Sequence, residues 1–252
     1  MMKKLFLLLG IAALLAVASL VAVDYFLGSI VRAGVNRYGP PLTKTRVELA
    51  GAEISPLTGS GTIRGLVIGN PPGWHSDRAV YLGQAHLSIE PFSLFGDHVI
   101  VKDILIDQPE FVYETRIISS NLKDLLKNIE ASTSDGSQGV EPAKTNSGRP
   151  RRFEVKRFRL QNARVTIGVG AAAITVPMPT IIINDLGTKE GGITANQLTA
   201  AVMERVLRQV LLTAANAIGK ASKSAGSAAT DTTIDAAKRA VEDLKKLFGG
   251  KN

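Results

Sequence analysis

A few histidines and aspartates are the residues that could support acid–base or metal chemistry. The histidines are spread along the chain without the short spacing typical of metal ligands, and the aspartates fit a turn and solvent-facing strand positions. The chain also lacks the G-x-S-x-G, Walker A and H-E-x-x-H motifs. We therefore expect a protein that is not an enzyme and that uses no metal or cofactor. The residues considered are His75, His86, His98, Asp97, Asp103 and Asp107.

A run of arginines and lysines over residues 149–159 is the strongest charge feature. Such a run is usually a solvated strand edge that discourages aggregation. Alternatively, arginine binds phosphate through paired hydrogen bonds, so the run could contact the headgroups of phospholipid or lipopolysaccharide. The candidates for headgroup contacts are Arg149, Arg151, Arg152, Arg157 and Arg159.

Composition narrows the choice of partner and of scaffold. The 252 residues carry a net charge of +8, so nucleic acid and anionic lipid are both candidate partners. The hydrophobic content of 45% supports a core. The absence of cysteine excludes a disulfide scaffold, a thiolate metal site, a cysteine nucleophile and a lipoprotein anchor.

The N-terminal segment predicts export of the rest of the chain. Lys3 and Lys4 precede nineteen residues without a charge, Leu5 to Val23, which is enough to cross a bilayer as a helix. We expect a transmembrane anchor over residues 1–27. A cleaved signal peptide, with Ala16-Val17-Ala18 near the cleavage site, is the alternative. Both interpretations export the body and argue against nucleic acid as a partner.

The body of the chain reads as a β-domain over residues 45–190. Short apolar runs alternate with turn signals from Val47 to Tyr113, which favours an antiparallel sheet. Strands resume at Phe153, where the apolar positions change parity and predict a bulge near Lys156-Arg157.

Helices are expected at two places. Leucines and an isoleucine at helical spacing predict a helix over residues 121–130 with Asn121 as its N-cap, followed by a flexible loop over residues 131–150. Residues 195–252 form an amphipathic helical tail. Its last helix, residues 231–248, either packs on its own domain or a partner protein, or lies on an anionic membrane surface.

The order of these segments resembles the AsmA-like family of bacterial envelope proteins over about residues 1–190. The resemblance lies in GLVIGNPPGW, SLFGDHVIVKDILIDQPEFVYE and NLKDLLKNI, followed by FEVKRFRLQNARVTIG. It implies an N-terminal anchor in the bacterial inner membrane, a body in the periplasm, and a twisted, U-shaped antiparallel sheet with an apolar inner face. Larger members of the family are regarded as carriers of lipid across the periplasm.

Two functions are therefore expected. The first is a groove that holds or transfers lipid acyl chains and supports outer-membrane assembly and lipid homeostasis. The alternative is a closed structural or protein-interaction module without lipid cargo. In either case the Asn70–Trp74 turn forms a corner of the sheet, where Trp74 packs over the sheet end or touches the membrane interface. The candidate groove residues are Val47, Leu49, Leu66, Ile68, Leu87, Ile89, Ile104 and Ile106.

Overall fold

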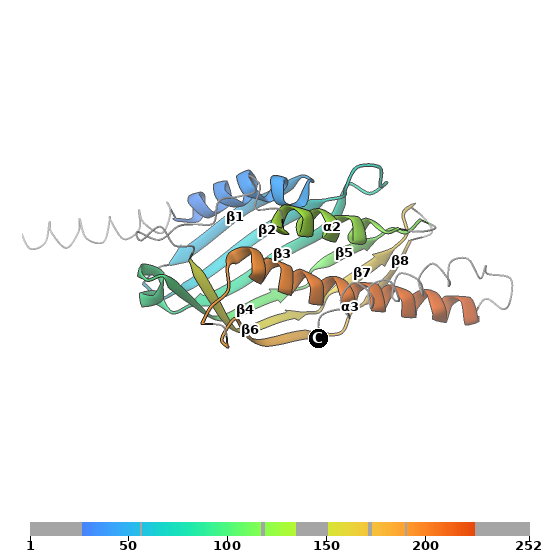
Figure 1. The fold of residues 1–252 in the computed structure, drawn as a ribbon. Coiled ribbons are helices and arrows are strands. Elements are labelled where there is room, and N and C mark those ends of the chain that lie inside the picture. Colours follow the sequence, from blue (N-terminus) through green and yellow to red (C-terminus); the bar gives the residue numbers. More distant parts are fainter. Residues whose placement is uncertain are drawn as a thin grey trace, which may run out of the picture.

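The computed structural model shows a nine-stranded mixed sheet that curls into a half-barrel, with helices along its inner face (Figure 1). It describes residues 27–55, 57–116, 119–134, 151–170, 173–189 and 191–224. The expected anchor up to residue 26, most of the expected 131–150 loop and the expected 231–248 helix lie outside these ranges. Within these ranges, no helix is both long enough and apolar enough to cross a membrane.

The described chain forms nine strands, three α-helices and one 3-10 helix. A helix covers residues 27–43. It is followed by β1 (Val47–Ser55), β2 (Ser60–Gly69), β3 (Arg78–Ile89), the 3-10 helix η1 (Pro91–Phe95), β4 (His98–Asp107), β5 (Glu110–Tyr113), α2 (Asn121–Ser134), β6 (Arg152–Gln161), β7 (Arg164–Ile167), β8 (Ile174–Pro177), β9 (Ile181–Leu186) and α3 (Ala195–Ser224).

Three pairs of strands act as long, interrupted strands. β3 pairs with β4 along one half of its length and with β5 along the other half, so β4 and β5 together form one long strand. In the same way, β6 and β7 form the next long strand, which pairs with β4 and β5. β9 and β8 form the last one, which pairs with β6 and β7. Gln108 and Asn162 sit at two of the junctions, both with positive φ, 53° and 54°. The sheet therefore consists of six long strands, three of which break at the same level.

A transverse crease runs through this level of the sheet. Gly51, Gly65 and Gly83 lie on it in β1, β2 and β3, and Pro109 and Pro179 lie on it in the interrupted strands. Gly65 has φ of 63°, which suits glycine. Proline interrupts strand pairing because it has no N–H to donate. The crease bends every strand at one level and helps to curl the sheet.

Inward-facing positions change parity across the crease. On β3, Val80 and Ala85 both face inward although they are five positions apart, an odd number, which in a regular strand would put them on opposite faces. A second change of parity lies in β6, where Lys156 and Arg157 are both exposed between buried Val155 and Phe158. β4 changes parity at the same level, so the two strands stay in register. The predicted change of parity at Lys156-Arg157 is therefore present, but the predicted bulge is not, because β6 keeps one register with both β4 and β9. The register shift at this level lies between β3 and β4, at Ser88 and Ile89.

The expectation of a purely antiparallel sheet was wrong. β4 pairs with β6 and β5 pairs with β7, in both cases in parallel. Parallel neighbours need a crossover connection of a dozen or more residues. The connection from β5 to β6 contains α2, which packs on the sheet and lets the chain return to the end where β4 began.

The helix α2 is the crossover element and lies over the inner face. It runs to Ser134, four residues beyond the predicted end at residue 130. Its apolar stripe is fully buried. Ser120, and not Asn121, caps the helix, because its Oγ accepts a hydrogen bond from the Lys123 N–H at 3.2 Å. The stripe consists of Leu122, Leu125, Leu126 and Ile129.

The helix α3 also lies over the inner face, where it contacts α2 and the strands β5 to β8 (Figure 1). It begins at a capping box, in which Thr194 and Gln197 exchange side-chain and backbone hydrogen bonds.

The helix over residues 27–43 protects the free edge of β1. The Asn36 side chain accepts a hydrogen bond from the Leu49 N–H at 2.6 Å, and the Arg32 side chain donates one to the Leu49 carbonyl at 3.1 Å. Gly39 lies directly against Val47. These contacts use backbone groups that would otherwise be open to pairing with another chain.

Candidate functional site

Two rows of apolar residues cross the inner face between the crease and the end of the sheet that carries η1. Residues that face one another across neighbouring strands lie on the same face, so each row is continuous from β1 to β9. At about 4.8 Å per strand, the six strands span about 24 Å. The first row is Ile54, Gly61, Leu87, Ile104, Phe158 and Ile183, and the second is Ala52, Ile63, Ala85, Ile106, Leu160 and Ile181.

The two halves of these rows differ in burial. Phe158 and Leu160 on β6 are each only 2% exposed. Ala85 on β3 is buried as well, and Ile181 on β9 is partly buried. The larger aliphatic residues on β1 to β4 are only partly buried. We call this partly exposed set the apolar strip. It consists of Ile54, Ile63, Leu87, Ile104 and Ile106.

The helix α3 accounts for this difference. Its buried residues lie in the middle of the helix, and the main contacts of α3 with the sheet fall on β5 to β8. Leu198, Val202 and Met203, nearer its start, are partly buried against the core. The inner face is thus well covered over β5 to β8 and less covered along the apolar strip. The buried residues are Val206, Leu207, Val210, Leu211 and Ala214.

The eight predicted groove residues all lie on the inner face, but in two settings. Leu87, Ile89, Ile104 and Ile106 lie on the η1 side of the crease, and all four pack partly buried against the core. The other four lie beyond the crease, where Val47 and Leu49 are buried beside the 27–43 helix. Leu66 and Ile68 pair with these two residues and are partly buried.

The predicted headgroup arginines do not gather at the apolar strip. Arg157 and Arg159 both bind Asp103, with N–O distances of 2.6 and 2.7 Å. Arg159 alternates with the inward-facing Phe158 and Leu160, so this cluster lies on the outer face. The hydrogen bond from Arg159 is the largest effect on Asp103 and helps to hold its pKa below the usual range.

Of the predicted headgroup arginines, two others lie within the described residues, at the start of β6. Arg152 donates a hydrogen bond to the Gly192 carbonyl at 3.0 Å, and Arg151 is partly buried. Arg149 lies outside the described residues. The structure therefore places Arg151 and Arg152 at the start of β6, and Arg157 and Arg159 on the outer face of the sheet.

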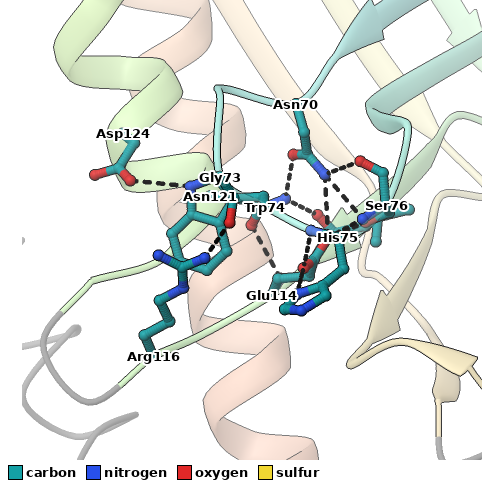
Figure 2. Close-up of polar contacts among 10 residues, drawn as sticks. Asn70, Gly73, Trp74, His75, Ser76, Glu114, Arg116, Asn121 and Asp124 are labelled. Carbon is teal, nitrogen blue, oxygen red and sulfur yellow. Dashed lines mark hydrogen bonds and ion pairs between the residues drawn. The ribbon is translucent and has the colours of Figure 1, made fainter.

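A polar cluster around the Asn70–Trp74 turn was not predicted (Figure 2). Its centre is Glu114, a buried residue that is only 4% exposed. The carboxylate accepts hydrogen bonds from the backbone N–H groups of His75 and Ser76 at 2.9 and 2.8 Å, and from the Asn70 side chain at 3.1 Å. The Ser76 hydroxyl also donates to it.

Hydrogen bonding outweighs burial at this carboxylate. Burial by itself raises the pKa of Glu114, but the hydrogen bonds from Ser76 and His75 together hold that pKa below its ordinary value. The loop after β2 therefore stabilises the ionised form of the Glu114 carboxyl group. Only its position directly after the apolar strand EFVY distinguishes Glu114 in the sequence, and that signal is weak.

Trp74 connects the turn to α2 (Figure 2). Its indole N–H donates to the Asp124 carboxylate in the first turn of α2 at 3.0 Å, and the Arg116 guanidinium stacks 4.6 Å from the ring centroid. The Asn121 side chain also binds Asn70, at 2.7 Å. The turn thus joins the end of β2 to the start of α2, as expected for a tryptophan packed over the sheet end.

A cavity of about 670 Å³ lies between the start of the 27–43 helix and the β1–β2 hairpin. Gly28, Ser29 and Arg32 line one side, and residues of β1 and β2 such as Ser55 and Ser60 line the other. Its lining is mostly polar and small residues, and Ile54 of the apolar strip also contributes to it.

Comparisons with models of protein families, with curated proteins and with solved structures find no match. Among the residues that the structure describes, no group of His, Cys, Asp or Glu is arranged to hold a metal ion. The resemblance to the AsmA-like family therefore stays a prediction from the order of the motifs.

Proposed function

We propose that this chain is a membrane-anchored envelope protein of the AsmA-like type whose curled sheet holds or transfers lipid acyl chains. The observation that carries the proposal is the apolar strip, an aliphatic part of the inner face that α3 leaves partly exposed. Aliphatic surface of this kind is normally buried, so its partial exposure favours an apolar ligand.

The mechanism in this proposal is apolar shielding. Each CH₂ group moved from water onto such a surface gains about 0.8 kcal/mol, and the gain needs no specific polar contact. Acyl chains would lie on Leu87, Ile104 and Ile106, and the partly buried residues of α3 would form one wall. The protein would act in the periplasm from an inner-membrane anchor and would support outer-membrane lipid homeostasis.

Site-specific photocrosslinking tests this proposal. Leu87 of the apolar strip and His86, its exposed neighbour facing outward on β3, are each replaced by p-benzoylphenylalanine in the full-length chain. Irradiation of cells followed by mass spectrometry is expected to give a lipid adduct at position 87 and little at position 86. Equal labelling of both positions, or no lipid adduct at position 87, would contradict the proposal.

A closed protein-interaction module is the second candidate, and the cover that α3 provides favours it. The buried residues of α3 close the inner face over β5 to β8. In this case residues 231–252 would bind an envelope protein. Deletion of these residues is then expected to release a co-purifying protein and to leave the lipid content unchanged.

A further inference from the structure

Three apolar side chains are strongly exposed at one end of the half-barrel. Phe92 in η1 is 84% exposed, Leu57 in the β1–β2 turn is 64% exposed, and Ile30 in the first described turns of the 27–43 helix is 60% exposed. We call this the Gly28 end. The opposite end, where the Asn70–Trp74 turn lies, is the Trp74 end.

The loops that carry Leu57 and Phe92 are neighbours. The Ile89 N–H donates a hydrogen bond to the Gly59 carbonyl at 2.6 Å, so the β1–β2 turn lies against the entry to η1. A side chain at Gly59 would meet the Ile89 carbonyl, which shows how close the two loops are. Figure 1 shows the hairpin and η1 together at the left of the sheet.

The start of the described chain lies at the same end. Gly28 packs on the carbonyl of Ala52, and the 670 Å³ cavity connects Gly28 with Ser55 and Ser60, beside the β1–β2 turn. The apolar segment Leu5–Val23 ends four residues before Leu27. Four peptide steps span at most about 15 Å, so a bilayer that holds this segment must lie close to the Gly28 end.

We propose that Leu57 and Phe92 insert into the interface of that bilayer, so that the half-barrel stands with its Gly28 end on the membrane surface. Apolar and aromatic side chains at loop tips gain free energy at this depth. The nearby charge is partly balanced, because Glu90 before η1 pairs with Lys102 at 2.7 Å. Docking would place the η1 side of the apolar strip next to membrane lipid.

This inference rests on the membrane attachment in the proposed function and not on the lipid cargo. Tryptophan quenching tests it, because Trp74 is the only natural tryptophan and lies at the opposite end. β3 separates the two ends by about 36 Å at 3.3 Å per residue. The variants are Leu57→Trp, Phe92→Trp and, as the control, Val169→Trp, at a 42% exposed position at the Trp74 end.

Each full-length variant is placed in phosphatidylethanolamine–phosphatidylglycerol vesicles with and without brominated phosphatidylcholine, and the wild-type signal is subtracted. The added fluorescence of Leu57→Trp and Phe92→Trp is expected to be quenched at least about twofold more than that of Val169→Trp, as for interfacial side chains. Equal, weak quenching of all three variants would overturn the docking proposal.

Flotation of the same vesicles separates this outcome from failure of the proposed function. A chain that does not float with vesicles would overturn both the membrane attachment and the docking. A chain that floats but shows no selective quenching would overturn the docking alone. The lipid cargo is measured independently on detergent-extracted protein.

Discussion

At the residue scale, Glu114 holds together three segments that are far apart in the sequence. It binds the loop after β2, while its backbone binds the Asn121 side chain at the start of α2. The sequence indicated a corner at Asn70–Trp74, and the corner is there. The carboxylate that fixes it could not be predicted, because its partners become neighbours only when the sheet forms.

Replacement of Glu114 by glutamine is expected to destabilise the protein by about 2 kcal/mol, since hydrogen bonds to a charged group are lost and an amide N–H₂ faces other donors. The control is Glu110→Gln in the preceding strand β5, where the partly exposed carboxylate pairs with Arg78. Its cost is expected to stay within about 0.5 kcal/mol. Chemical unfolding in detergent measures both. Equal costs for the two variants would contradict this role of Glu114.

Acid is expected to remove the contribution of Glu114. Its pKa is lowered in the folded protein, so the unfolded chain binds more protons in acid. The stabilisation is fully present above the unfolded carboxyl pKa of about 4.3 and is lost as the pH falls through the folded pKa. The difference in unfolding free energy between wild type and Glu114→Gln should therefore shrink below about pH 4. A difference that is constant from pH 7 to pH 3 would argue against a charged Glu114.

At the element scale, the crease explains why apolar alternation was an uncertain guide. The strands β1 to β3 and the helices α2 and α3 were indicated by their apolar patterns and turn residues. Pairing could not be read in the same way, because α2 as a crossover makes two strand pairs parallel. The parity change at Gly65 and Gly83 shifts every inward-facing position beyond it, as any irregularity in a strand of period two must.

The crease predicts a sharp difference between two glycines on paired strands. Gly65→Ala is expected to cost about 1–3 kcal/mol, because Gly65 has positive φ and a new Cβ would lie 2.8 Å from the Ala50 Cβ. Gly51→Ala is the control, since its Cβ would meet no atom within 4 Å. Thermal unfolding should show a lower Tm for Gly65→Ala only. Similar Tm values for the two variants would show that the crease does not depend on Gly65.

At the scale of the whole molecule, the order of motifs predicted a mainly β fold with an apolar inner face, and the half-barrel has one. The extent to which α3 covers that face could not be predicted, since it depends on how a 30-residue helix crosses the strands. The placement of Arg157 and Arg159 was also beyond the sequence. Their contact with Asp103 joins β4 to β6, which are paired through the unexpected parallel register.

A matched pair of charged variants tests whether the apolar strip binds lipid. Ile104 faces inward in the strip, and its neighbour Leu105 faces outward between His86 and Arg159. Ile104→Glu would place a charge where acyl chains are proposed to lie and is expected to abolish bound lipid, because an unpaired charge is costly in apolar surroundings. Leu105→Glu should retain it. Lipidomics on purified, folded variants measures the difference, and equal lipid content would contradict the proposed site.

The most direct test of the central claim is native mass spectrometry of the full-length protein after mild detergent extraction, with lipidomics on the same sample. We predict a stoichiometric phospholipid or glycolipid on the wild-type chain. A chain that carries no lipid, or carries only another polypeptide, would contradict the lipid-holding function and would favour the closed interaction module.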